Sequence, residues 1–148
     1  MKSRLLMVFV LVLAVATSPV RTSSEPTRAT HGMVVSQNTI ASRVGVDVLR
    51  DGGNAIDAAI ATAFALAVVH PSAGNIGGGG FIVFRPATGE PVAYDFREMA
   101  PGRSHPTMFL VDGKYDEKLH HESYLSVGVP GTVAGLHMAW KEQGKLPW

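Results

Sequence analysis

Residues 54–69 restrict the possible folds of this chain more than any other segment, because they predict a helix that is apolar on nearly every side. After Asn54, which is expected to begin the helix, only Asp57 and Thr62 interrupt its apolar surface. A helix of about 15 residues is about 22 Å long, and crossing a bilayer takes about 20 apolar residues. The segment must therefore be buried inside a folded domain, where its many alanines let neighbouring elements approach closely.

The residues before this helix predict two of those neighbouring elements. Residues 32–36 (GMVVS) are expected to form a short strand. Asn38 is expected to cap an amphipathic helix that stops at Gly52 and Gly53, where the backbone needs a positive φ. The apolar face of this helix is expected to consist of Ile40, Ala41, Val44 and Val48.

The residues after it predict a hairpin and a final helix. Residues 81–85 and 91–97 are expected to pair as strands around a turn at 86–89. Pro130 is expected in the first turn of a helix that ends at Gly144. One side of that helix is expected to carry Val133, Leu136 and Trp140. The order strand, helix, helix, hairpin, helix predicts an α/β (α+β) fold of sheet and helix layers.

The N-terminus has the pattern of a secretory signal peptide. Lys2 and Arg4 precede an unbroken apolar run of 12 residues, and the small residues before position 17 suit signal peptidase. The alternative, an uncleaved anchor, needs a longer run. We therefore expect residues 1–16 to be a signal peptide and 17–30 a disordered leader rich in Ser, Thr and Pro. The protein is expected to be exported, to the periplasm or the extracellular space.

Composition excludes several classes of site and partner. The chain has no cysteine, which rules out disulfides, thiolate metal sites and a cysteine nucleophile. Cleavage after Ala16 would remove two of the 13 basic residues and none of the 12 acidic ones, so the mature net charge would be −1. Without a basic excess, nucleic acid is not expected as a partner.

The glycine run Gly77–Gly80 invites a phosphate-binding interpretation that its context does not support. A P-loop needs a Lys and a Ser or Thr after its last glycine, at the start of a helix. Here Phe81 and a predicted strand follow, and the dinucleotide-binding motif fails for the same reason. We expect instead a backbone held against bulky neighbours, where any Cβ would clash.

Two other candidate sites are weak. His120, His121 and Glu122 would need a histidine in place of Leu125 to form a zincin motif, so no metal site is expected. Thr17 would become the N-terminal residue after cleavage, and such a threonine can act as a nucleophile. Thr17 lies in the predicted leader, where no neighbouring residues could form a pocket. We therefore expect its position after the cleavage site to have no catalytic meaning.

Arg97 is the strongest candidate binding residue. It ends a predicted strand beside a turn, and loops at strand ends often carry binding groups. Its guanidinium could hold a carboxylate through two parallel hydrogen bonds. The alternative is a local ion pair with Asp95 or Glu98.

Taken together, the segments resemble the N-terminal region of γ-glutamyltranspeptidases. The matching stretches run in family order and spacing across about residues 31–148. They are DGGNAIDAAIA (51–61), GNIGGGGF (74–81), DFREMAP (95–101), GVPGTVAG (128–135) and GKLPW (144–148).

The resemblance implies a fold and a chemistry. The fold would be part of the αββα sandwich of N-terminal-nucleophile hydrolases, incomplete in this chain. The activity would be γ-glutamyl transfer from glutathione or related compounds to water, amino acids or peptides, without a cofactor. The nucleophile would be the N-terminal threonine of the small subunit, created by self-cleavage of a precursor. The resemblance also implies that Arg97 holds the substrate α-carboxylate.

On this basis the chain is expected to be the N-terminal fragment of the large subunit. The catalytic threonine would lie beyond Trp148, so no catalytic residue is assigned here and the fragment alone should be inactive. Two alternatives remain open. One is a related acylase of the glutaryl or cephalosporin type. The other is a non-catalytic secreted binding protein, which predicts that residues 31–148 fold as a soluble monomer.

Overall fold

The computed structural model describes residues 26–148. The expected signal peptide and residues 17–25 of the expected leader lie outside this range. Residues 26–30 are exposed and belong to no helix or strand. The elements described below all lie in one unit, His31–Trp148.

The first described helix, α2 (Thr39–Arg50), confirms the predicted caps. The Asn38 side chain accepts a hydrogen bond from the N–H of Ile40 at 2.8 Å, and Gly52 beyond the helix has a φ of 91°. Its buried residues are Ala41 and Gly45. The expectation that Ile40 belongs to the buried face was wrong, because its side chain is 61% exposed. Gly45 faces α3 instead, and a Cβ there would overlap the hydroxyl of Thr62.

The apolar helix α3 (Ala55–Val69) begins one residue after the expected start, because Asn54 is its N-cap and forms a capping box with Asp57. Burial is concentrated in its first half, at Ile56, Asp57, Ala58, Ile60 and Thr62. The second half of the helix is only partly buried. The prediction that α3 is buried on most sides is therefore confirmed only for its first half. No helix among residues 26–148 is long and apolar enough to cross a bilayer.

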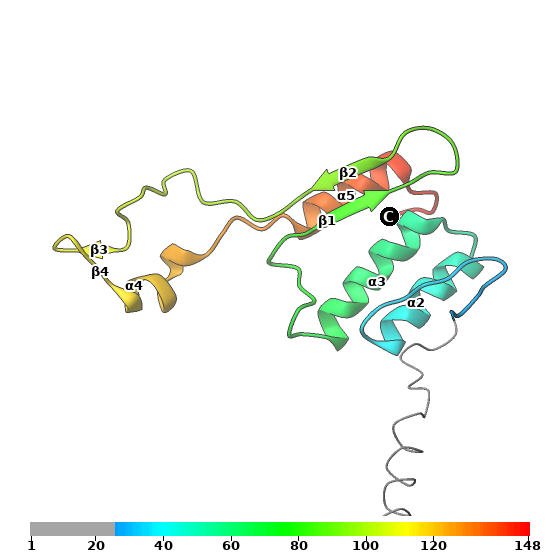
Figure 1. Ribbon diagram of the computed structural model, residues 1–148, viewed down its shortest axis with the longest axis horizontal. Helices are drawn as coiled ribbons and strands as arrows, with labels where there is room; N and C mark the ends of the chain where they lie inside the picture. The colour runs from blue at the N-terminus through cyan, green and yellow to red at the C-terminus, as the bar shows by residue number, and fades with distance from the viewer. Residues whose placement is uncertain (1–25) are drawn as a thin grey trace, which may run out of the picture. The chain divides into compact units, whose positions relative to one another are not determined.

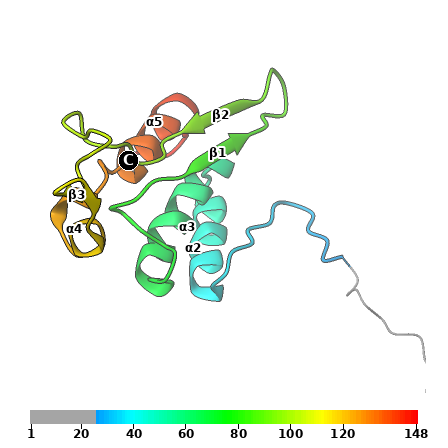
Figure 2. The same ribbon diagram turned by 60° about the vertical axis from the view of Figure 1, so that its left-hand side comes forward.

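The predicted hairpin is confirmed as the antiparallel pair β1 (Phe81–Phe84) and β2 (Val92–Asp95). Phe81 is opposite Asp95 and Phe84 is opposite Val92, so alternate residues face the same side. The inward side meets α3 and the final helix, α5 (Thr132–Gln143), in a core of five buried residues. These are Ile56, Ile60, Tyr94, Leu136 and Ala139. Figures 1 and 2 show α2 beside α3 and α5 running along β2.

Tyr94 of this core has a polar partner on α5. Its hydroxyl donates to the carboxylate of Glu142 at 3.0 Å, so the buried phenol is hydrogen-bonded. Burial of the ring, followed by this hydrogen bond, raises the pKa of Tyr94 above its ordinary value.

Two expectations about α5 were wrong. The helix begins at Thr132, so Pro130 precedes the N-cap residue Gly131 instead of lying in the first turn. Val133 is 45% exposed, and the buried face is formed by Thr132, Gly135, Leu136 and Ala139. Gly135 determines this orientation, because only a residue without a side chain leaves room for the ring of Phe96.

Residues 103–126 contain short elements. Strands β3 (Leu110–Val111) and β4 (Lys114–Tyr115) pair around Asp112 and Gly113, which have φ values of 50° and 75°. Both central residues of such a two-residue turn need a positive φ, which Asp112 and Gly113 adopt. Helix α4 (Glu117–His121) and the 3-10 turn η1 (Tyr124–Ser126) follow.

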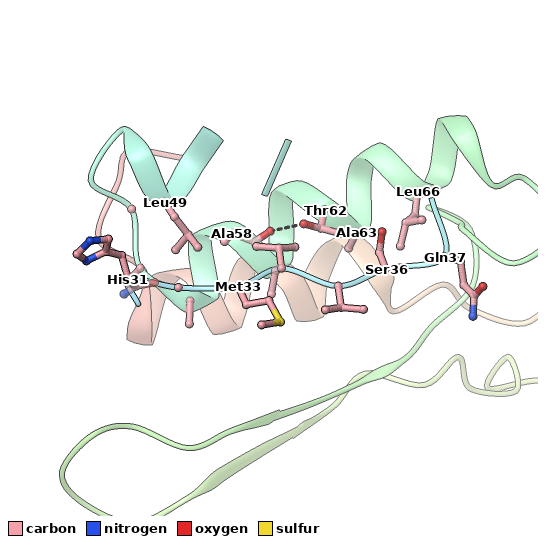
Figure 3. A pocket seen from close by; sticks show the side chains of 16 residues that line it. His31, Met33, Ser36, Gln37, Leu49, Ala58, Thr62, Ala63 and Leu66 are labelled. Atoms are coloured by element: carbon pink, nitrogen blue, oxygen red, sulfur yellow. Dashed lines mark hydrogen bonds between the residues drawn. The ribbon is translucent and has the colours of Figure 1, made fainter. Parts of the chain in front are cut away.

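The strand predicted at residues 32–36 is not formed in the described part of the chain. The segment belongs to no sheet and runs along α3 (Figure 3). A strand requires a partner for its backbone N–H and C=O groups. None of the described residues provides one, so the prediction of a strand at residues 32–36 was wrong.

Candidate substrate-binding site

Arg97 lies just beyond the end of β2. Its backbone N–H donates to the Asp95 carboxylate at 3.1 Å, while the side chain is exposed. Within residues 26–148 the one ion pair joins Arg50 to Asp47, at 2.9 Å. The guanidinium of Arg97 therefore forms no ion pair with Asp95 or Glu98, and the local ion-pair interpretation is wrong.

The glycine loop, residues 75–80, lies directly against the backbone of this segment. A Cβ on Gly79 would overlap the backbone of Arg97 and Glu98, and one on Gly80 would lie 2.9 Å from the Phe96 ring. The predicted close approach is therefore confirmed at these two glycines. It does not hold for Gly77, which has open space around it.

Phe96 fixes the same segment from the other side. Its N–H donates to the carbonyl of Gly80 at 3.1 Å, and its ring lies on Gly135 of α5. A Cβ on Gly131 would overlap the carbonyl oxygen of Phe96. Arg97 thus extends from a short stretch of backbone held tightly between the glycine loop and the start of α5.

Two hollows meet at Arg97. The α5 hollow, about 590 Å³, lies between the end of β2 and the first turns of α5, and the loop hollow, about 430 Å³, lies against residues 99–128. Arg97, Glu98 and Met99 line both. The α5 hollow also has apolar walls, formed by Val129, Pro130, Ala134 and Met138.

This arrangement suits an anionic ligand with an apolar portion. The guanidinium could hold a carboxylate through two parallel hydrogen bonds. Asp95 and Glu98 line the same α5 hollow, so a cationic group on the ligand would also find partners. Binding and orientation are the chemistry that these side chains can supply.

The described residues offer no well-placed nucleophile or metal site. His105 and Thr107 are hydrogen-bonded at 3.1 Å, but they are two positions apart on an exposed loop. The Tyr115 hydroxyl lies 2.7 Å from His120 and 3.3 Å from His121. Within residues 26–148 no group of three or more His, Asp or Glu side chains is arranged to hold a metal ion.

A hollow larger than these two lies elsewhere in the described part. It measures about 840 Å³ and lies between residues 31–37 and α3 (Figure 3). Its walls are mostly apolar, and the Thr62 hydroxyl on them already donates to the carbonyl of Ala58 at 2.7 Å. Its lining residues include His31 but no Asp, Glu, Lys or Arg, so it offers no carboxylate or guanidinium to a ligand.

Comparison with known proteins identifies the family. Residues 41–148, which include Arg97, the glycine loop and α5, match the family model described as gamma-glutamyltranspeptidase. The chain belongs to the γ-glutamyltranspeptidase family. The resemblance carried by the five sequence stretches is confirmed.

Relatives of known sequence and structure agree with this assignment. The glutathione hydrolase proenzyme of Escherichia coli is 52% identical over 123 residues, which make up 82% of this chain and 21% of that protein. The chain thus spans about a fifth of the length of the curated relatives it matches. The crystal structure of Helicobacter pylori γ-glutamyltranspeptidase superposes with a TM-score of 0.77 at 52% identity. That match covers 82% of this chain and 35% of the other.

The structure of an acylase is also similar to this chain. Cephalosporin acylase from Bacillus halodurans matches with a TM-score of 0.61 and 30% identity, covering 88% of this chain and 25% of that chain. The mixed architecture of helices and short strands is therefore shared between γ-glutamyltranspeptidases and an acylase, and fold alone does not separate the two activities.

Sequence reasoning missed part of the site. Three of the five family stretches, those containing Gly79, Arg97 and Thr132, converge in space. Thr132 is 6% exposed, and its hydroxyl donates a hydrogen bond to the side chain of Asn75. Neither Thr132 nor Asn75 was predicted as a site residue. The sequence did offer one signal for Thr132, which is its position directly after Pro130 and Gly131 at a helix start. That signal did not identify Asn75 as its hydrogen-bond partner.

Proposed function

We propose that this chain supplies the carboxylate anchor of a γ-glutamyl-transferring enzyme. In this reaction a threonine hydroxyl attacks the γ-amide carbonyl of glutathione or a related compound, and the amine leaves. Water, an amino acid or a peptide then takes the γ-glutamyl group from the threonine ester. The threonine is proposed to lie outside these 148 residues, on a small subunit cut from the same precursor, and the reaction needs no cofactor.

The observation that carries this proposal is the exposed guanidinium of Arg97, which forms no ion pair within the described residues and lies where two hollows meet. An α-carboxylate held there would fix one end of the γ-glutamyl group, away from the bond to be broken. Fixing that end lowers the entropic cost of bringing the γ-carbonyl to a nucleophile. Family membership supports the assignment of the substrate class.

The remainder of the active site is proposed to come from the rest of a longer protein. The curated relatives are about five times as long as the matched segment, and those from Escherichia coli and Pseudomonas are named proenzymes. We infer that residues 31–148 contribute helices and part of a sheet to an αββα sandwich that other segments complete.

Replacing Arg97 by Lys tests the anchor. In the complete processed enzyme, Arg97→Lys should raise KM for γ-glutamyl donors at least about tenfold, because a single ammonium cannot reproduce the two parallel hydrogen bonds. Arg85→Lys is a matched control, since the Arg85 side chain is hydrogen-bonded to the Gly89 carbonyl at the turn of the hairpin. Steady-state kinetics that showed an unchanged KM in Arg97→Lys would remove Arg97 from the site.

An acylase that takes substrates such as glutaryl amides is the second candidate, favoured by the match to cephalosporin acylase. A glutaryl group lacks the α-amino group but keeps a terminal carboxylate, so Arg97 could serve both. Comparing kcat/KM for γ-glutamyl and glutaryl anilides in the complete enzyme would separate the two activities.

We propose that the protein is exported to the periplasm or the extracellular space. The support is the basic start and the apolar run of residues 5–16. N-terminal sequencing of the mature protein should then give a first residue within a few positions of Thr17. A mature chain that retained residues 1–16 would contradict export by a cleaved signal.

A further inference from the structure

The position of Arg97 depends on the glycine loop. Gly79 is so close to the backbone of Arg97 and Glu98 that no side chain lies between them. A shift of the loop would therefore be passed directly to the backbone from which the guanidinium extends. Whatever holds the loop in place also sets where the guanidinium can reach.

The loop is held by the start of α5. The carbonyl of Gly78 accepts hydrogen bonds from the N–H groups of Gly131, at 2.8 Å, and Thr132, at 3.1 Å. The N-cap residue Gly131 has no side chain to bond these groups. The loop carbonyl thus satisfies donors that a side chain would otherwise cap.

A side-chain hydrogen bond reinforces this connection. The Asn75 side-chain oxygen accepts from the N–H of Gly78 at 2.9 Å and from the hydroxyl of Thr132 at 2.6 Å. Thr132 is 6% exposed, so its hydroxyl is shielded from competing water. We call the Asn75–Thr132 hydrogen bond the clamp.

We infer that Asn75 and Thr132 are positioning residues for Arg97, acting through the glycine loop to set the affinity for the substrate carboxylate. This inference rests on the proposed role of Arg97. Neither Asn75 nor Thr132 lines the two hollows at Arg97. Loss of the clamp should therefore weaken donor binding while leaving the chemical step nearly unchanged.

Thr132→Val, which replaces the hydroxyl by a methyl group of similar size, tests this in the complete processed enzyme. It should raise KM for the γ-glutamyl donor about threefold to tenfold, the range expected for loss of one buried hydrogen bond. The value of kcat and the KM for the acceptor should each stay within about twofold. Thr132→Ser keeps the hydroxyl and should restore the donor KM.

Thr62→Val is the matched control. Thr62 is also buried, at 7% exposed, and its hydroxyl donates to the Ala58 carbonyl on the side of α3 that faces Gly45. The same chemical change there should leave the donor KM unchanged. An equal rise in Thr62→Val and Thr132→Val would overturn the inference, because a general loss of stability would then explain both.

Asn75→Ala provides a second test of the clamp. Because Asn75 and Thr132 share one hydrogen bond, the double variant should raise the donor KM by less than the product of the single effects. Fully multiplicative effects would contradict a shared clamp. If Arg97→Lys raises KM but Thr132→Val does not, positioning fails while the proposed function stands. If Arg97→Lys leaves KM unchanged, the proposed function fails.

Discussion

The Asp57 carboxylate accepts backbone N–H groups from a residue three positions before it and from a segment that begins 88 positions after it. At the start of α3 it accepts from Asn54 at 2.8 Å, and after α5 it accepts from Lys145 at 3.1 Å and Leu146 at 3.3 Å. Asp57 is 7% exposed, so these donors satisfy a charge that burial would otherwise disfavour. One residue thus caps a helix and joins it to the segment after α5.

Replacing Asp57 by Asn should lower the free energy of unfolding by about 1–3 kcal/mol, because hydrogen bonds to a buried charge are lost and an NH₂ group meets backbone donors. Denaturant titration of the complete protein measures this change. Asp47→Asn is the control: that carboxylate pairs with Arg50 on the surface, and its loss should cost less than about 1 kcal/mol. Similar losses in the two variants would show that the Asp57 network contributes little.

At the scale of elements, the predictions succeeded where the signal was local. The cap at Asn38 and the positive φ at Gly52 depend on a few adjacent residues, and both were confirmed. The strand expected at residues 32–36 was wrong, because strand formation depends on a partner that local sequence does not specify.

The orientation of α5 shows the same limit. Its apolar residues predicted a buried face that included Val133, whereas the structure buries Thr132 and Gly135 instead. The ring of Phe96 needs the space above Gly135, and that contact joins residues almost forty positions apart. Periodicity finds a helix, but the elements packed against it decide how the helix is rotated.

The whole unit leaves much apolar surface exposed. On the outer side of the hairpin, Phe81 is 64% and Val83 is 79% exposed, and further large apolar side chains are exposed at Met99, Val127 and Val129. Apolar patches of this kind mark surfaces that another layer or partner covers. This agrees with the proposal that further segments complete the sandwich.

Residues 31–148 expressed alone should therefore self-associate as concentration rises, because the hairpin exposes both its outer apolar side and its strand edges. Sedimentation velocity measures this, and replacing both Phe81 and Val83 by Thr should reduce the association. A soluble monomer across the whole concentration range would instead favour the non-catalytic binding protein.

The sequence by itself determined the helices and their caps, the hairpin, the family and the choice of Arg97, because each follows from local chemistry or from motifs of adjacent residues. Only the tertiary structure revealed that Arg97 has no ion-pair partner in the described part of the chain. It also revealed the clamp, which holds the glycine loop that packs against the backbone of Arg97. Asn75 and Thr132 are 57 positions apart, so their hydrogen bond exists only once the glycine loop has folded onto α5.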